Sequence, residues 1–93
     1  MIDIRSDAQR LRDGTIPGAL RIPRNVLEWR LEPGGGDAIP ELARRDRRLI
    51  LVCHEGYQSS LAAAMLRRLG LDSADLIGGF CAWREQGLPV ERG

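Results

Sequence analysis

Cys53 is the residue of this 93-residue chain that is best placed for chemistry. It directly follows the apolar run of residues 49–52, and a short loop with one glycine separates it from an alanine-rich helical segment expected from Ser59. A thiol between the end of a strand and the start of a helix lies near unpaired backbone N–H groups and the helix dipole, which both favour negative charge. We therefore expect Cys53 to ionise more readily than a free cysteine and to act as a nucleophile. The alternative is a buried cysteine that only closes a core strand.

The composition indicates one small globular domain, residues 1–93, without room for a second core. Hydrophobic residues make up 43% of the chain and charged residues 29%, as in ordinary soluble proteins. A net charge of +1 argues against bulk binding of nucleic acid. No signal-like segment or apolar run of roughly 18 residues is present, so we expect a cytoplasmic protein that does not bind membranes. Two distant cysteines form neither a disulfide framework nor a metal-ligand spacing, and the sequence predicts no cofactor.

Strand-like and helix-like segments alternate along the chain. Strands are expected at residues 1–4, 19–22, 49–52 and 71–77, and helices or helical turns at residues 7–12, 24–31, 37–45, 59–69 and 80–86. The run at 49–52 is continuously apolar and too short for a helix, which is typical of a central parallel strand. The alternation predicts an α/β fold in which helices cover both faces of a parallel sheet. Because ligands bind at the carboxyl ends of the strands in such sheets, Cys53 lies at the expected binding edge.

Four segments resemble, in order and spacing, the motifs of the rhodanese-like family of sulfurtransferases. Asp3-Ile-Arg5 is similar to the family's Asp-Val-Arg, and Gly14-Thr-Ile-Pro-Gly-Ala19 is similar to its Gly-His-Ile-Pro-Gly-Ala. The central motif, Cys-x-x-Gly-x-x-Ser, resembles Cys53-His-Glu-Gly-Tyr-Gln-Ser59. The closing motifs resemble Gly78-Gly-Phe-Cys-Ala-Trp83 and Gly87-Leu-Pro-Val90. No single segment is specific, but the four together span almost the whole chain.

The resemblance implies a three-layer fold with about five short parallel strands and an active-site loop that begins at Cys53. The family usually has one more strand and helix ahead of the motif at Asp3. Their absence here implies a trimmed domain, or an edge that a partner chain or a fused region completes.

The activity implied by the resemblance is transfer of sulfane sulfur. Cys53 would take the outer sulfur of a donor as a persulfide and pass it to cyanide or to a thiol, of a small molecule or of a protein. The backbone amides from His54 to Gln58 would form a nest around the extra sulfur, and Gly56 would let the loop turn tightly. Family members often carry arginine at the positions of His54 and Gln58. This departure weakens the case for thiosulfate and leaves room for another donor, such as a persulfide.

The other loop side chains are candidate substrate contacts, each with an ordinary alternative. Ser59 is expected to cap the following helix, and the sulfur of the cysteine is the alternative partner of its hydroxyl. His54 as a cation would favour the thiolate, although a loop histidine is often only solvent-exposed. Glu55 and Tyr57 are expected at the rim of the pocket. Arg24 is expected beside it, with exposure to water as the alternative.

Two other functions are compatible with parts of the same loop. A phosphatase of the dual-specificity kind shares the fold, but it needs an arginine six positions after the cysteine, where this chain has Ser59. A catalytically idle module that binds a partner or senses oxidants would fit the absence of loop arginines.

Cys81 could resolve a Cys53 persulfide or disulfide if the Gly78-Gly79 turn lies near the loop, whereas a helix cysteine is usually packed or inert.

Overall fold

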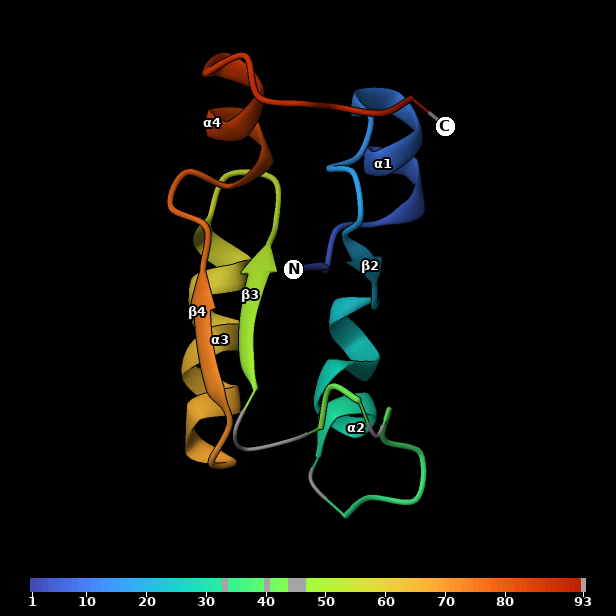
Figure 1. Cartoon of the computed structure of the whole chain (residues 1–93), viewed down its shortest axis with the longest axis vertical. Coiled ribbons are helices and arrows are strands. Elements are labelled where there is room, and N and C mark those ends of the chain that lie inside the picture. The colour runs from blue at the N-terminus through green and yellow to red at the C-terminus, as the bar shows by residue number, and fades with distance from the viewer. Residues whose placement is uncertain (33, 40, 44–46, 93) are drawn as a thin grey trace.

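The computed structural model describes residues 1–32, 34–39, 41–43 and 47–92, and Figure 1 shows their arrangement. The elements in chain order are β1 (Ile2–Asp3), α1 (Asp7–Asp13), β2 (Leu20–Arg21), the 3₁₀ turn η1 (Arg24–Val26), α2 (Leu27–Leu31), β3 (Arg48–Val52), α3 (Tyr57–Arg68), β4 (Asp72–Asp75) and α4 (Gly79–Glu85). Each strand is followed by helical structure, which confirms the α/β alternation predicted from the sequence.

The strands form one parallel sheet in the order β2-β1-β3-β4. β3 pairs with β1 on one side and with β4 on the other, so it is an interior strand, as predicted for residues 49–52. The described residues form four strands and not the five implied by the resemblance. All four strand-like segments of the sequence are used, and in the glycine-rich segment the Gly35 N–H donates a hydrogen bond to the Glu32 carbonyl.

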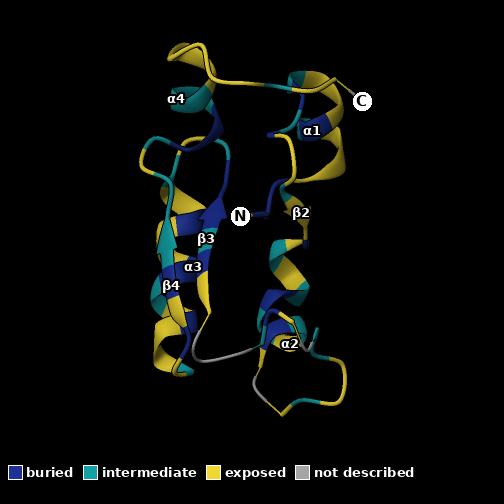
Figure 2. Ribbon diagram, viewed as in Figure 1, coloured by how far each residue is buried: buried dark blue, intermediate teal, exposed yellow. Residues whose placement is uncertain are grey.

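The alternation of side chains along β3 divides the core into two clusters on opposite faces of the sheet. Leu49 and Leu51 belong to the cluster that includes the buried residues of α2 and α3. Val52 belongs to the other cluster, with Phe80 of α4 and Ile16. Figure 2 shows that β3 is exposed where it begins and buried at its carboxyl end. Helices therefore lie on both faces of the sheet, as predicted.

α3 begins at Tyr57, two residues earlier than the sequence predicts, and its amino-terminal cap is Gly56 in the left-handed conformation. The expectation that Ser59 caps this helix is therefore wrong. Ser59 is the third residue of the helix and is fully buried. A capping residue is recognised in a sequence by its polar side chain, and glycine offers none, which is why the true start was missed.

The face of α3 that packs on the sheet carries small residues. Ala62, Ala63 and Leu66 are buried, whereas Leu61 and Met65 of the apolar stripe are 52% and 38% exposed. The alanines let the helix lie close to β3 and β4. No helix in the described ranges is long and apolar enough to cross a membrane.

The helix expected at residues 37–45 does not form in the part of that segment that the structure describes. Residues 37–39 and 41–43 adopt turn and irregular conformations. One hydrogen bond of the α-helical kind joins the Ala43 N–H to the Ile39 carbonyl. Residues 40, 44 and 45 of the expected helix lie outside the described residues.

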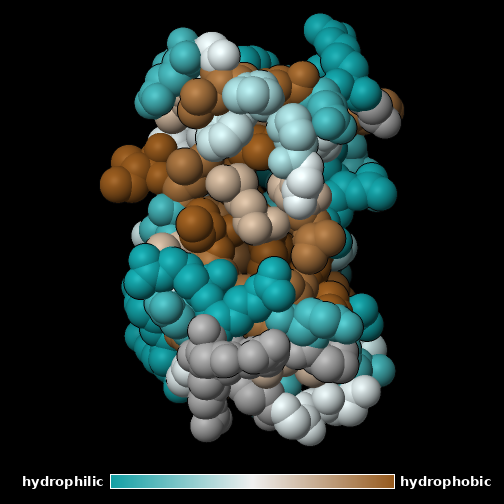
Figure 3. All heavy atoms as spheres, viewed as in Figure 1, coloured by the Kyte–Doolittle hydropathy of each residue, from teal (hydrophilic) through white to brown (hydrophobic). Residues whose placement is uncertain are grey.

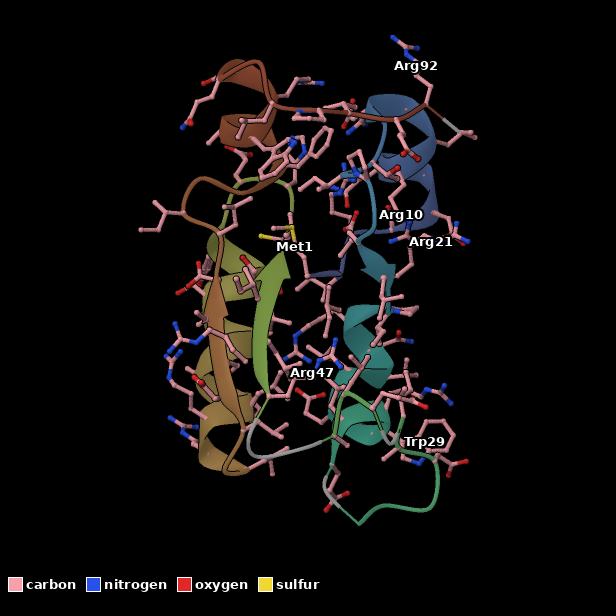
Figure 4. All side chains as sticks on the ribbon, viewed as in Figure 1. Met1, Arg10, Arg21, Trp29, Arg47 and Arg92 are labelled. Carbon is pink, nitrogen blue, oxygen red and sulfur yellow. The ribbon has the colours of Figure 1, made fainter. Side chains whose placement is uncertain are left out.

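The sheet face opposite α3 is apolar at its centre. Figure 3 shows apolar side chains gathered there, with polar residues around them. Ile50 of β3 and Ala74 of β4 pair in register and are half-buried, and Met1, labelled at the centre of Figure 4, is 40% exposed. α4 covers this face only near the carboxyl ends of the strands, where the second core cluster lies.

A buried ion pair ties the end of β1 to the rest of the fold. The Arg5 guanidinium donates to the Asp3 carboxylate at 2.8 Å and to the Gly14 carbonyl at 2.8 Å. Its carbon Cζ lies 4.0 Å from the ring centroid of Phe80, in a cation–π contact. Asp3 and Arg5 are each only 2% exposed. One guanidinium therefore joins β1, the exit of α1 and the start of α4.

We predict that Asp3→Asn lowers the free energy of unfolding by about 3–5 kcal/mol, because it leaves the buried charge of Arg5 without its counter-ion. Urea denaturation at neutral pH, followed by circular dichroism, measures the change. The control is Asp72→Asn, which removes the partner of Arg48 in an exposed pair and should change the same quantity by less than about 1 kcal/mol. Equal losses in the two variants would contradict the role given to the Asp3–Arg5 pair.

Candidate active site

Cys53 is the first residue after β3 and lies at the carboxyl edge of the sheet, where parallel sheets bind their ligands. In Figure 1 the chain turns directly beyond the arrowhead of β3 and enters α3. This turn, residues 53–56, borders a pocket of ≈ 280 Å³. The lining residues are Ile4, Arg5, Gln9, Arg24, Cys53, His54, Glu55, Tyr57 and Gln58.

The sulfur of Cys53 is held by the backbone of its own loop. The Gly56 N–H donates to Sγ at 3.0 Å, and the Ser59 N–H donates to it at 3.3 Å. Backbone N–H groups that converge on one atom form an anion-binding nest. A hydrogen bond to a charged acceptor is also stronger than one to a neutral acceptor. The loop can therefore place two backbone donors against negative charge on this sulfur.

The Ser59 hydroxyl can serve both forms of this sulfur. Its oxygen lies 3.3 Å from Cys53 Sγ and 3.3 Å from the carbonyl oxygen of Gly56. When Cys53 is a thiol, the S–H can donate to the hydroxyl oxygen while the hydroxyl donates to the carbonyl. When Cys53 is a thiolate, the hydroxyl can turn its hydrogen to the sulfur. The sequence offered two partners for this hydroxyl, the start of the helix and the sulfur of Cys53. The structure places it beside the sulfur.

The structure brings the predicted site residues together around this sulfur. Arg24, Cys53, His54, Glu55, Tyr57 and Gln58 line the pocket, and Gly56 and Ser59 contact the sulfur itself. Cys53 is only 5% exposed, so the pocket is its route to solvent. The Arg24 guanidinium donates to the Glu28 carboxylate at 2.6 Å, and part of its charge is therefore already paired.

Arg5 lines the same pocket and is not among the residues that the sequence predicts for the site. Its side chain is buried, and Nη1 has no hydrogen-bond partner in the described part of the chain. The sequence could have indicated Arg5, because this residue follows β1. Adjacent parallel strands such as β1 and β3 end at the same edge of a sheet, so residues that follow them lie near one another. Gln9 of α1 and Ile4 reach the pocket in the same way.

The loop keeps its shape because the glycine turn before α4 packs against its backbone. A Cβ on Gly79 would lie 2.5 Å from the carbonyl oxygen of Cys53 and 2.7 Å from the nitrogen of Gly56, where no side-chain atom fits. Gly79 also has a φ of 62°, which disfavours any other residue. This close approach lets the Phe80 N–H donate to the Cys53 carbonyl at 2.8 Å.

The imidazole of His54 contacts the second cysteine of the chain. Its Nε2 and Nδ1 atoms lie 3.4 Å and 3.7 Å from Sγ of Cys81 on α4, and Nδ1 lies 3.8 Å from a carboxylate oxygen of Asp13. The Cys81 N–H also donates to the His54 carbonyl at 3.0 Å. The Gly78-Gly79 turn before α4 therefore lies near the loop after Cys53. This closeness is the condition that the sequence sets for a chemical role of Cys81.

Asp13 is held as a carboxylate by the cations around it. Arg12 donates hydrogen bonds to the two Asp13 oxygens at 3.1 and 3.0 Å. These hydrogen bonds are the main reason that the pKa of Asp13 is lowered, and partial burial opposes them. The charges of Arg12, Arg84 and His54 lower it further. Asp13 is consequently negative at neutral pH.

A larger hollow of ≈ 510 Å³ is bordered by α1, β2 and residues 91–92, but it holds no candidate nucleophile. Figure 4 labels the arginines that line it, and acidic residues balance their charge; the charged lining residues are Arg10, Arg21, Arg92, Asp3, Asp7 and Glu91. Within the described ranges, no three histidine, cysteine, aspartate or glutamate side chains are placed to hold a metal ion. We therefore assign the site to the pocket of Cys53.

Known proteins of similar sequence and structure match almost the whole chain. The family model described as "Rhodanese-like domain" matches residues 1–86. A sulfurtransferase from Allochromatium vinosum is 33% identical over 91 residues, which cover 97% of this chain and 76% of the relative. Human thiosulfate:glutathione sulfurtransferase is 33% identical over 94 residues, which cover 92% of this chain and 79% of the relative. A solved structure from Rhodopseudomonas palustris, described as a protein of unknown function and possible tyrosine phosphatase, has a TM-score of 0.90 at 37% identity and covers 97% of this chain and 68% of that chain.

We predict that Gly79→Ala lowers the free energy of unfolding by at least about 2 kcal/mol more than Gly87→Ala, because only the first places a methyl group against backbone atoms. Both glycines have positive φ, 62° and 74°, but a Cβ on Gly87 would meet nothing within 4 Å. The difference between the variants therefore isolates the clash from the backbone strain. Denaturation in urea measures both, and indistinguishable losses would refute the close contact as the support of the loop.

Proposed function

The chain belongs to the rhodanese-like domain family, and on that basis we propose that it is a sulfurtransferase that carries sulfane sulfur on Cys53 as a persulfide. The observation that carries this proposal is the sulfur of Cys53, which borders a pocket and accepts hydrogen bonds from the Gly56 and Ser59 N–H groups. The donor is a small sulfur anion such as thiosulfate or a persulfide. The acceptor is cyanide or a thiol, of a small molecule or of a protein.

The first half-reaction loads the cysteine. The Cys53 thiolate attacks the outer sulfur of the donor, so that a new S–S bond forms at Cys53 while the bond inside the donor breaks. The electron pair of the broken bond leaves with the rest of the donor, as sulfite from thiosulfate or as a thiolate from a persulfide. Cys53 becomes a persulfide without any added oxidant or cofactor.

The start of α3 supports an anionic outer sulfur. Tyr57 and Gln58 form the first turn of the helix, where backbone N–H groups have no acceptor within the helix, and both residues line the pocket. The helix dipole adds partial positive charge at the same point. In the second half-reaction the acceptor attacks the outer sulfur and Cys53 leaves as a thiolate, which the Gly56 and Ser59 N–H groups stabilise.

The charges of the pocket favour a donor with little negative charge at its far end. Arg5 is a buried cation of the lining, but Arg24 is already paired with Glu28. The loop adds the neutral Gln58 and the acidic Glu55, and no arginine. We therefore propose a low-molecular-weight persulfide as a better donor than thiosulfate. The name of the human relative, which joins thiosulfate and glutathione, supports a small thiol as the partner in transfer.

Phosphatase activity is the competing enzymatic function, because a similar solved structure is described as a possible tyrosine phosphatase. Such an enzyme clamps the phosphoryl group with an arginine six positions after the cysteine. That position is Ser59 here, and its side chain is buried beside the Cys53 sulfur. A serine cannot supply a bidentate charged clamp, so we expect no hydrolysis of aryl phosphates.

We predict that the Cys81→Ser variant, incubated with glutathione persulfide, gains one sulfur atom by intact-protein mass spectrometry and loses it again to an added thiol. The Cys81→Ser background leaves Cys53 as the only thiol of the chain. The matched control, Cys53→Ala/Cys81→Ser, should gain no sulfur. If Cys81→Ser gains none from a persulfide, mercaptopyruvate or thiosulfate, the alternative of a catalytically idle binding or redox-sensing module replaces the enzyme.

Gln58→Arg tests the reason given for the choice of donor. The substitution places a cation on the pocket wall, and a charge-assisted hydrogen bond of about 1.5–3 kcal/mol should lower KM for thiosulfate roughly tenfold or more. The control is Gln86→Arg, which adds the same charge at the exposed carboxyl end of α4. Steady-state assays of sulfite release at constant ionic strength measure both. An unchanged KM, or the same change in the control, would contradict an anion contact at position 58.

A further inference from the structure

Cys81 lies in a group of side chains that sulfur transfer by Cys53 does not use. The thiol of Cys81 is half-buried, 3.4 Å from Nε2 and 3.7 Å from Nδ1 of His54. The imidazole in turn lies 3.8 Å from the carboxylate of Asp13. The three side chains come from α4, from the loop after β3 and from the last residue of α1, so the fold and not the sequence brings them together.

A thiol, an imidazole and a carboxylate in this order are the groups that activate cysteine nucleophiles. The imidazole nitrogen beside the sulfur can accept the thiol proton as the sulfur attacks. The imidazolium that forms is stabilised by the negative charge of Asp13, which stays ionised because Arg12 lowers its pKa. The arrangement therefore supplies a nucleophile, its base and a residue that positions the base.

Two guanidinium groups, those of Arg12 and Arg84, lie beside the carboxylate of this group. Arg84 Nη1 lies 3.7 Å from Oδ1 of Asp13, an oxygen that also accepts a hydrogen bond from Arg12. The pKa of Arg12 is raised, mainly by its hydrogen bond to Asp13 and then by the negative charge of Asp13. The backbone also fixes the pair, because the Cys81 N–H donates to the His54 carbonyl at 3.0 Å.

We propose that Cys81 is a second sulfur-accepting thiol of this protein, with His54 as its base and Asp13 as the residue that positions the base. Its substrate is the outer sulfur of a low-molecular-weight persulfide. The choice of donor rests on the proposed function, whereas the reactivity of the thiol does not. The sulfur of Cys81 attacks the outer sulfur of the donor, its proton passes to His54, and the donor S–S bond breaks. The electron pair leaves with the donor thiolate, so Cys81 becomes a persulfide and no oxidant is consumed.

The reactivity of Cys81 can be measured by itself, because the chain has two cysteines and Cys53→Ala leaves only this one. We expect iodoacetamide to alkylate Cys53→Ala near neutral pH at least about tenfold faster than Cys53→Ala/His54→Gln, since glutamine cannot take the proton. A loop loosened by the second substitution would expose Cys81 and speed the reaction, so a slower reaction reports the lost base. Equal rates, or a faster reaction in the double variant, would overturn the proposal.

The role of Asp13 has its own readout. In the Cys53→Ala background, Asp13→Asn should slow the alkylation of Cys81, and Asp13→Glu should restore much of the rate because it returns the charge. A purely structural role would give similar rates in the asparagine and glutamate variants, and that result would remove Asp13 from the proposal.

Sulfur uptake separates this proposal from the function of Cys53. With glutathione persulfide, Cys53→Ala should gain one sulfur atom by intact mass, and Cys53→Ala/Cys81→Ser should gain none. If Cys53→Ala gains no sulfur while Cys81→Ser does, Cys53 remains the site of transfer and the role of Cys81 is overturned. If only Cys53→Ala gains sulfur, Cys81 is confirmed as an acceptor and the proposed function of Cys53 fails.

Discussion

The approach of the Gly78-Gly79 turn to the backbone of the Cys53 loop is the contact on which the rest of the site depends. The missing Cβ at Gly79 leaves room for the Cys53 carbonyl and the Gly56 nitrogen at distances that no side chain allows. The loop is thereby held so that the Gly56 N–H points at the sulfur. The same contact brings α4 against the loop and places Cys81 beside His54. One backbone contact therefore supports two thiols in different surroundings.

The second constraint is the buried pair of Asp3 and Arg5. Because of it, a cation of the pocket comes from a buried residue and not from the loop after Cys53. A loop arginine would be mobile and would reach a substrate from outside. Arg5 is fixed by Asp3, by the Gly14 carbonyl and by the ring of Phe80, and it lines the pocket at a set position. A fixed, partly neutralised cation suits a donor of low charge. The loop without arginine and the paired, buried cation both support the persulfide donor proposed above.

The sequence predicts most of the fold and the location of the site, because both depend on local chemistry. The apolar strand before Cys53, the glycines and the alternation of elements are all visible in the order of residues. The start of α3 is not, because Gly56 caps it through backbone geometry and leaves Ser59 as the misleading polar candidate. The role of Asp13 is also hidden, since it reaches His54 through packing between elements that are distant in the chain. Spacing along a sequence contains no information about such contacts.

The central claim is that Cys53 carries a reactive, anion-stabilised sulfur that a small molecule reaches through the pocket. The rate of alkylation of Cys53 by iodoacetamide in Cys81→Ser, measured against pH and beside glutathione, tests it most directly. The account predicts that the folded protein reacts near neutral pH at least as fast as glutathione does. A folded protein that stays unlabelled, while the same chain in denaturant is fully labelled, would contradict it.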